Sequence, residues 1–439
     1  MVGLRLNVPF RRFWLASTVS DFGSYLTTLA LSVLVLLTLG GSPLDQGMVN
    51  AGRWAPYLLF GLFAGVWVDR FRRRLVLVVG DVGRGVLLTT VCLLALAGVL
   101  TVPVLVGLIF AFGVLALLSD AAHQSFLPQL VPRATLVRAN FRLQQSETAA
   151  QLSGSAVAGA LIAAITAPFA LLIDALTYFF SGWVLLSLRQ VESNRHPPRA
   201  ATSTVSRISE GLRWVYGHPR LGPLAIGSPI WFIGSAVLGT ALPALVLLEL
   251  GLGALGLGLI LGCAGVGTVI GLSLSLILDQ RFGTGRVMVS MRLLQPVAVA
   301  GIALSPTMAA GKSISSGAVG PNPADWPASL WLAVAAVAVG QFVFGLAMGV
   351  EGPLEVSYRQ AVTPDRLLAR MSATMRSVNR GMIVVGAILG GALATAAGAG
   401  AALWSAVVLM VVAGLVLAFS KFRTARIEHD ALSDVEALA

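Results

Sequence analysis

Polar residues follow one face of an otherwise apolar segment near the amino terminus. Ser17, Asp21, Tyr25, Thr28 and Ser32 are separated by steps of four, four, three and four residues. Because an α-helix has 3.6 residues per turn, these side chains form one stripe along it. Such a stripe is unfavourable against lipid, so it faces water or another helix. Asp21 is the member of the stripe that can bind a proton or contact a charged ligand.

Two later segments also carry ionisable residues at helical spacing. Glu147 and Gln151 are one turn apart, as are Arg376 and Arg380. We expect Asp21, Glu147 and Arg376 to lie at one depth, about nine residues or roughly 13 Å from the same end of their helices. Two interpretations are open. Arg376 or Arg380 neutralises Glu147 in a structural pair, or the four charged residues bind protons or substrate.

Other side chains have types and spacings that suit the wall of an internal cavity. Aromatic residues and Met favour an apolar, adaptable site, although in an apolar chain they also face lipid or the protein core. The expected lining set is Ser17, Tyr25, Thr28, Ser32, Gln151, Trp231, Ser235, Gln341 and Met348.

Motifs of enzymes and metal sites are missing from the sequence. It has no Walker A loop, HExxH, CxxC or nucleophile elbow, so we expect no enzyme activity, cofactor or metal. Cys92 and Cys263 lie inside apolar runs, which predicts neither a disulfide nor a metal site.

Composition indicates that lipid surrounds the helices that position these residues. Of the 439 residues, 56% are hydrophobic and 11% are charged, whereas soluble domains have about 25% charged residues. Mean hydropathy is +0.86. A membrane span needs about 20 apolar residues. Twelve runs of that kind occur at about 14–38, 47–68, 75–98, 102–122, 140–165, 168–188, 222–248, 254–278, 286–309, 328–352, 369–396 and 401–420. The expected fold is therefore an all-α membrane protein with twelve transmembrane helices.

Arginines fall in alternate gaps between these runs. Basic residues precede the first run and follow every even-numbered run, while Lys312 is almost alone in the other gaps. This distribution follows the positive-inside rule and predicts that both termini are cytoplasmic. It also explains the net charge of +11 without a nucleic-acid partner.

One long polar stretch divides the sequence into two halves. The expected parts are a six-helix half at 1–188, a linker at 189–221, a second half at 222–420 and a cytoplasmic tail at 421–439. Ile208, Leu212 and Val215 favour a short amphipathic helix on the inner membrane surface, with a plain linker as the alternative.

The two halves also resemble each other in sequence. The matches at a shift of 232 residues include Phe112 with Phe344, Gly113 with Gly345 and Arg138 with Arg370. Arg70-Phe71 matches Arg281-Phe282 at a shift of 211, and an extra outer loop before residue 328 accounts for the difference. A duplicated unit of six helices is typical of transporters, because two similar halves can move about a site between them.

The loop after the second run reads Gly65-Val-Trp-Val-Asp69-Arg70-Phe-Arg-Arg73-Arg74. It resembles the signature loop of the major facilitator superfamily, with Arg72 where that family usually has Gly. The stretches 13–23, 81–84 and 136–140 resemble a bacterial branch of drug and siderophore exporters of the transmembrane secretion effector type. The resemblance covers essentially the whole chain.

This resemblance implies two pseudo-symmetric six-helix halves in a bacterial inner membrane. It also implies a cytoplasmic latch between the halves, in which Asp69 faces the positive end of the eleventh helix and Arg73 pairs with Asp69 or Asp120. The alternative is that the arginines only set the topology. The implied latch set is Gly65, Asp69, Arg70, Arg73, Arg74 and Asp120.

We therefore expect a secondary active transporter that exports amphipathic, drug-like small molecules in exchange for protons, as a monomer in the lipid bilayer. Two departures count against antiport: Gly154-Ser155 stands where antiporters of the superfamily have Gly-Pro, and the Arg that proton antiporters commonly carry in the fourth helix is absent. A siderophore or lipid exporter, an uncoupled facilitator and a non-transporting membrane scaffold are the alternatives.

Overall fold

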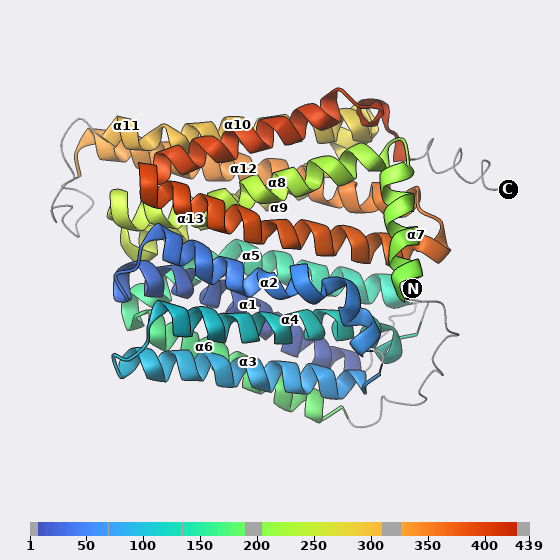
Figure 1. Ribbon diagram of the computed structural model, residues 1–439, viewed down its shortest axis with the longest axis horizontal. Helices are drawn as coiled ribbons and strands as arrows, with labels where there is room; N and C mark the ends of the chain where they lie inside the picture. The colour runs from blue at the N-terminus through green and yellow to red at the C-terminus, as the bar shows by residue number, and fades with distance from the viewer. Residues whose placement is uncertain (1–7, 69, 133–134, 189–203, 310–325, 428–439) are drawn as a thin grey trace. The chain divides into compact units, whose positions relative to one another are not determined.

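The computed structural model describes residues 8–68, 70–132, 135–188, 204–309 and 326–427 (Figure 1). These residues form α-helices joined by short connections. They divide into one unit comprising Met1–Gly40 and Gly52–Ala201, and a second comprising Gly41–Ala51 and Thr202–Ala439. Asp69 of the expected latch lies outside the described residues.

The first unit consists of long helices that pack side by side. Helix α3 lies against α4 and α6, and helix α1 lies against α5 and α6. The first residues of α2, up to Ala51, belong to the second unit. The helices are α1 (Val8–Val33, extended by a π-helix at Leu34–Thr38), α2 (Pro43–Val68), α3 (Arg73–Leu96), α4 (Val102–Leu130), α5 (Leu136–Ile165) and α6 (Ala167–Leu186).

The second unit repeats this packing order. Helix α10 lies against α12 and α13, and α8 lies against α13. Helix α13 consists of two arms, because Gly398 has a positive φ of 86° and bends the chain between them. The helices are α7 (Thr204–Gly217), α8 (Leu221–Ala244, extended by a π-helix at Leu245–Glu249), α9 (Gly253–Phe282), α10 (Thr284–Ala303), α11 (Ser305–Ala309), α12 (Ala328–Ala361), α13 (Asp365–Ala418) and a short 3₁₀-helix at Lys421–Thr424.

Two local details show the same duplication. Residues 34–40 and 245–251 differ only at Thr38 and Glu249, and in both segments a π-helical turn ends before a Gly with positive φ. Gly113 of α4 and Gly345 of α12 each approach a backbone carbonyl of the second long helix of their repeat, at Arg53 of α2 and Ala264 of α9. A side chain at either glycine would overlap that carbonyl.

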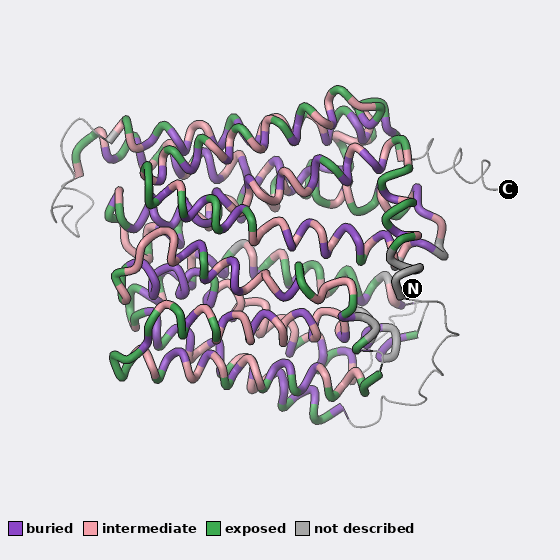
Figure 2. The backbone as a smooth tube through the Cα atoms, viewed as in Figure 1, coloured by how far each residue is buried: buried purple, intermediate pink, exposed green. Residues whose placement is uncertain are grey.

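The surface of the helices matches a lipid environment. Nine helices in the described part are long and apolar enough to cross a membrane, and the bent helix α5 makes ten. One of the nine is α13, whose two arms are joined at Gly398. Exposed residues recur along the helices (Figure 2), and many are large and apolar, such as Trp183 at 67% and Leu276 at 68%. Lipid is the solvent that tolerates such a surface.

The residues directly after α13, which begin the expected cytoplasmic tail, pack into the second unit. Phe422 is buried against Tyr358, with ring centroids 5.1 Å apart, and the Gly285 backbone N–H donates to the Ala425 carbonyl at 2.9 Å. Gly285 permits this contact because a Cβ there would overlap the Phe422 carbonyl. Residues 421–427 thus close the core of the second unit, because burying an aromatic ring outweighs the cost of ordering a short segment.

Candidate functional site

The polar stripe of α1 contacts other helices of the first unit, and Thr28 within it is exposed. Ser17 Oγ lies 3.2 Å from His123 Nε2 of α4, and Thr28 Oγ1 accepts from Arg53 Nη1 of α2 at 2.9 Å. Tyr25 packs against Gly154 of α5, where a Cβ would lie 3.0 Å from the Tyr25 Cβ. Ser32, at the far end of the stripe, is buried. The stripe therefore faces α2, α4 and α5.

Asp21 lies half-buried among other charged groups of the first unit. Glu147 and Asp120 add negative potential at its carboxylate, and Arg84 adds positive potential. Asp120 accepts the Tyr57 hydroxyl at 2.8 Å. Helices α4 and α5 therefore each place a carboxylate within electrostatic range of Asp21.

The helices begin earlier than the apolar runs indicate. Asp21 lies 13 residues after the start of α1, and Glu147 and Arg376 each lie 11 residues after the starts of α5 and α13. All three charges therefore lie farther from the start of their helices than the roughly nine residues expected. Glu147 and Gln151 are in the first unit, whereas Arg376 and Arg380 are in the second, so their pairing stays a prediction.

Asp174 of α6 was not among the expected site residues. Its buried carboxylate accepts the Thr27 hydroxyl of α1 and, at 2.8 Å, the Thr177 hydroxyl. Gly23 makes room for it, because a Cβ at that position would overlap Oδ1 of Asp174. The sequence signal that could have identified Asp174 was a carboxylate inside the sixth apolar run.

A second buried group joins α3 to α6. Asp81 pairs with Arg84 one turn later and accepts the Ser181 hydroxyl at 2.6 Å. The Arg84 guanidinium lies 4.4 Å from the centre of the Tyr178 ring, within range of a cation–π interaction. Asp81 and Arg84 are the ends of a stretch that carried the family resemblance, and here they hold two helices together.

One residue of the signature loop, Arg74, contacts the end of α6 within the first unit. Arg74 Nε donates to the Leu185 carbonyl at 3.0 Å, and Arg74 Nη2 donates to the Leu186 carbonyl at 2.6 Å. These are among the last carbonyls of α6, where a cation is stabilised by the helix dipole. Arg70 is exposed and Arg73 is half-buried. The latch role of this loop stays a prediction, and Gly65 lies in α2.

In the second unit the structure places the expected lining residues on α8 and α12. Trp231 is buried, its ring lies parallel to Phe344 at 6.5 Å, and its Nε1 donates to Gln295 of α10. Gln341 is buried one turn before Phe344, whereas Ser235 and Met348 are half-buried. Of the expected residues, Trp231 thus belongs to this aromatic pair, and Gln341 lies one turn from its other member.

A charged network beside Trp231 was also missed. Arg292 of α10 pairs with Glu351 of α12, and its Nη2 lies 3.2 Å from Glu355 Oε2. Glu355 in turn pairs with Arg359 at 3.2 Å. Arg292 and Glu351 both stood inside predicted spans, where ionisable residues mark functional positions. That signal was available from the sequence, but their partnership was not.

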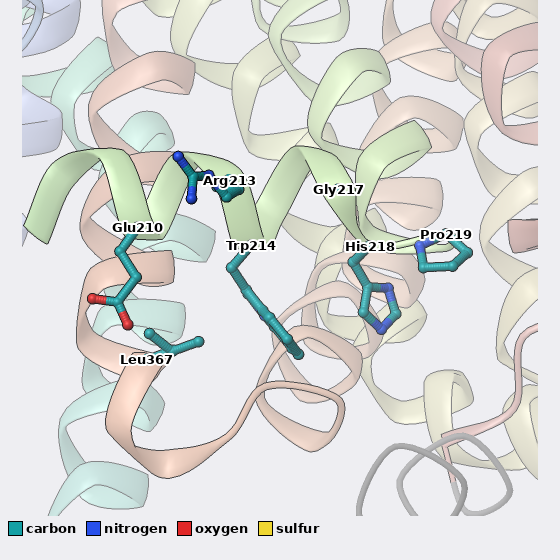
Figure 3. A pocket seen from close by; sticks show the side chains of 7 residues that line it. All are labelled: Glu210, Arg213, Trp214, Gly217, His218, Pro219 and Leu367. Carbon is teal, nitrogen blue, oxygen red and sulfur yellow. The ribbon is translucent and has the colours of Figure 1, made fainter. Parts of the chain in front are cut away.

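The linker contains α7, whose buried residues Gly211 and Val215 lie against α13 and α8. Glu210 of α7 pairs with Arg370 of α13. Beside this pair is an open cavity of about 410 Å³, and Figure 3 shows Glu210, Trp214 and His218 on one side of the helix. His218 Nδ1 accepts the Leu221 backbone N–H at 3.1 Å, so it is committed to the start of α8.

Two units with one packing order, each holding charged residues within apolar helices, define a secondary transporter of the major facilitator superfamily. Solved structures show the same fold over nearly the whole chain. A bacterial homologue of the iron transporter ferroportin, in an inward-facing state, aligns with a TM-score of 0.70 and 16% identity, covering 95% of this chain and 99% of the other. A point mutant of the nucleoside transporter NupG aligns with a TM-score of 0.71 and 12% identity, covering 93% and 99%.

The chain belongs to the transmembrane secretion effector family, whose model matches residues 3–319. Among curated relatives, the uncharacterised transporter YfiS of Bacillus subtilis is 26% identical over 47% of this chain and 49% of its own length, so the chain spans about half of that relative. Transporter y4rN of Sinorhizobium fredii is 23% identical over 95% of this chain and 94% of its own. The multidrug efflux pump Tap of Mycobacterium tuberculosis is 30% identical over 40% and 43%.

Proposed function

We propose that this transporter exports amphipathic, drug-like small molecules in exchange for protons, by alternating access. The observation that supports it most is the group of carboxylates in the first unit. Asp21 lies on a continuous polar stripe, in the field of Glu147 and Asp120. Proton binding by one of them removes a negative charge from among these apolar helices, and so changes which conformation has the lower free energy.

The partial similarity to the efflux pump Tap supports export of drug-like molecules. The arginine distribution supports a bacterial inner membrane with both termini in the cytoplasm. The repeated packing of α1 with α5 and α6, and of α8 with α13, supports two similar halves that move as bodies. We expect the transporter to act as a monomer.

The test is gradient-driven transport in proteoliposomes with the Asp21→Asn variant. The amide keeps the size of the side chain and removes its proton exchange, so efflux driven by a pH gradient should fall to the level of empty liposomes. Asp45→Asn is the matched control, because Asp45 is in the first turn of α2 and interacts with Ser42. Unchanged efflux by Asp21→Asn would exclude Asp21 as the coupling residue. Efflux without proton movement would favour a facilitator.

A further inference from the structure

Helices α8, α10 and α12 enclose a group of charged, polar and aromatic side chains that we call the Arg292 cluster. It consists of Trp231, Arg292, Gln295, Glu351 and Glu355. Arg292 pairs with Glu351, and Gln295 Nε2 donates to Glu351 Oε2 at 2.8 Å while its Oε1 accepts from Trp231. All contacts of the cluster lie within the second unit.

The cluster combines the two groups that bind organic cations. The centre of the Arg292 guanidinium lies 5.1 Å from the centroid of the Trp231 ring, and Phe344 lies parallel to that ring. Glu351 supplies a carboxylate that is only 4% exposed. An aromatic face beside a desolvated carboxylate attracts a planar cation more strongly than either group alone. Arg292 is itself a planar cation, so it occupies the position that such a ligand would take.

Arg292 uses only part of its hydrogen-bonding capacity. Both of its carboxylate contacts involve Nη2. Within the described residues neither Nε nor Nη1 has an acceptor, although the side chain is 2% exposed. A buried arginine with a purely structural role normally pairs all the N–H donors of its guanidinium, because each unpaired donor costs free energy. The two carboxylate contacts of the guanidinium therefore both pass through one nitrogen, Nη2.

A row of charged side chains extends from the cluster toward the end of α12. Glu351, Glu355 and Arg359 follow one another at helical spacing, and exposure of the last two rises to 15% and 19%. The charged side chains of α12 therefore become more exposed toward the end of the helix. α12 ends two residues after Arg359, at Ala361.

We infer that the Arg292 cluster binds the charged ring of a flat aromatic cation, and that the Arg292 guanidinium fills this site when no such ligand is bound. This inference rests on the proposed export of small molecules and names the substrate class. The ligand displaces Arg292 from the Trp231 face, and Glu351 becomes its counter-ion.

The test is equilibrium binding of ethidium, a flat aromatic monocation, to the purified full chain in lipid nanodiscs, read by fluorescence polarisation. Glu351→Gln and Trp231→Ala should each weaken binding by about tenfold or more, because each removes one wall of the site. Arg292→Gln should tighten binding severalfold, because it removes the internal competitor. A structural ion pair predicts the opposite sign for Arg292→Gln, so unchanged or weaker binding by that folded variant would overturn the inference.

Removing Arg292 alone leaves a buried carboxylate without its partner, which destabilises proteins. If Arg292→Gln does not fold, the charge-balanced pair Arg292→Gln with Glu355→Gln replaces it, and tighter ethidium binding is again expected. Glu249→Gln is the matched control at a carboxylate of the same unit outside the cluster and should bind like the parent chain. Loss of binding in that control as well would contradict a site at the cluster.

The binding experiment uses no proton gradient, so its outcome is independent of proton coupling. If ethidium binds as expected but Asp21→Asn still performs gradient-driven efflux, the coupling proposal fails and the cluster stands. If efflux depends on Asp21 while Glu351→Gln binds ethidium normally, the cluster proposal fails and the transport proposal stands.

Discussion

The Thr27 hydroxyl of α1 donates to the Asp174 carboxylate of α6, and both side chains are buried in the first unit. Thr177 donates to the other carboxylate oxygen at 2.8 Å. Gly23 allows Asp174 to approach the backbone of α1. A buried acid thus joins two helices through hydroxyl groups, on the same helix α1 that carries Asp21.

Gly23→Ala should destabilise the transporter. The added methyl group would overlap Asp174 Oδ1 and lie 2.5 Å from Thr177 Oγ1, so the Asp174 side chain must leave its place or α1 and α6 must separate. Overpacking of this kind costs about 1–3 kcal/mol, which thermal unfolding of the purified chain in detergent would detect. Gly107→Ala in α4 is the matched control, because nothing lies within 4 Å of its Cβ position. Equal melting of the two variants would argue against the close contact of α1 with α6.

Arg74→Ala should loosen the end of α6. The variant loses the hydrogen bonds to the Leu185 and Leu186 carbonyls, each worth about 1.5–3 kcal/mol for a charged donor before solvent replaces it. Hydrogen–deuterium exchange should speed up in the last turn of α6, measured by mass spectrometry of its peptides. Arg70→Ala, at an exposed position of the same loop, should leave that exchange unchanged. A transport defect in Arg74→Ala without faster exchange would instead support the latch role.

Gly398→Ala should destabilise the connection between the two arms of α13. Gly398 has φ of 86° and ψ of 162°, a conformation essentially restricted to glycine, and another residue held there pays about 1–3 kcal/mol. Glu249 accepts the Ala399 backbone N–H at 2.8 Å at this bend. Glu249→Ala should lower the melting temperature, and Glu249→Gln should retain most of it, because an amide oxygen still accepts. If Glu249→Ala and Glu249→Gln melt alike, the hydrogen bond contributes nothing measurable.

The pair of Glu210 and Arg370 should hold α7 against α13 only weakly. The two side chains are 43% and 32% exposed, so the pair is worth about 0.2–1 kcal/mol and weakens as salt rises. Glu210→Gln should make α7 more accessible to a protease in low salt, with little difference from the parent chain in high salt. Reversing both charges, Glu210→Arg with Arg370→Glu, should restore protection. Failure of the double reversal would show that the pair is not what holds the helix.

Much of the site was predictable where the signal is local. The spacing of Ser17, Asp21 and Thr28 predicts one helical face, and the structure confirms that this face contacts other helices. Trp231, expected to line a cavity, lies parallel to Phe344, and its lining role stays a prediction. The membrane-spanning character and the family were also predictable, because both depend on composition and on short motifs.

The helix ends and the tail were less predictable. Apolar runs mark where a helix meets lipid, but α12 continues to Ala361, about nine residues beyond its run, because polar residues can extend a helix into water. Phe422 lies in the core because Gly285 leaves space for the backbone beside it, and that space arises only when α10 and α12 are in place.

By itself the sequence determined the class of fold, the duplicated plan and the ionisable residues that lie within apolar helices. These follow from span length, periodicity and the cost of a charge in lipid, which are properties of single segments. Only the tertiary structure decided which residues are partners. Thr27 and Asp174 are 147 positions apart, and Gln295 and Glu351 are 56 apart, so no local pattern links them. Their pairing depends on how each helix is rotated about its axis, and the packing of all the helices in a unit sets that rotation.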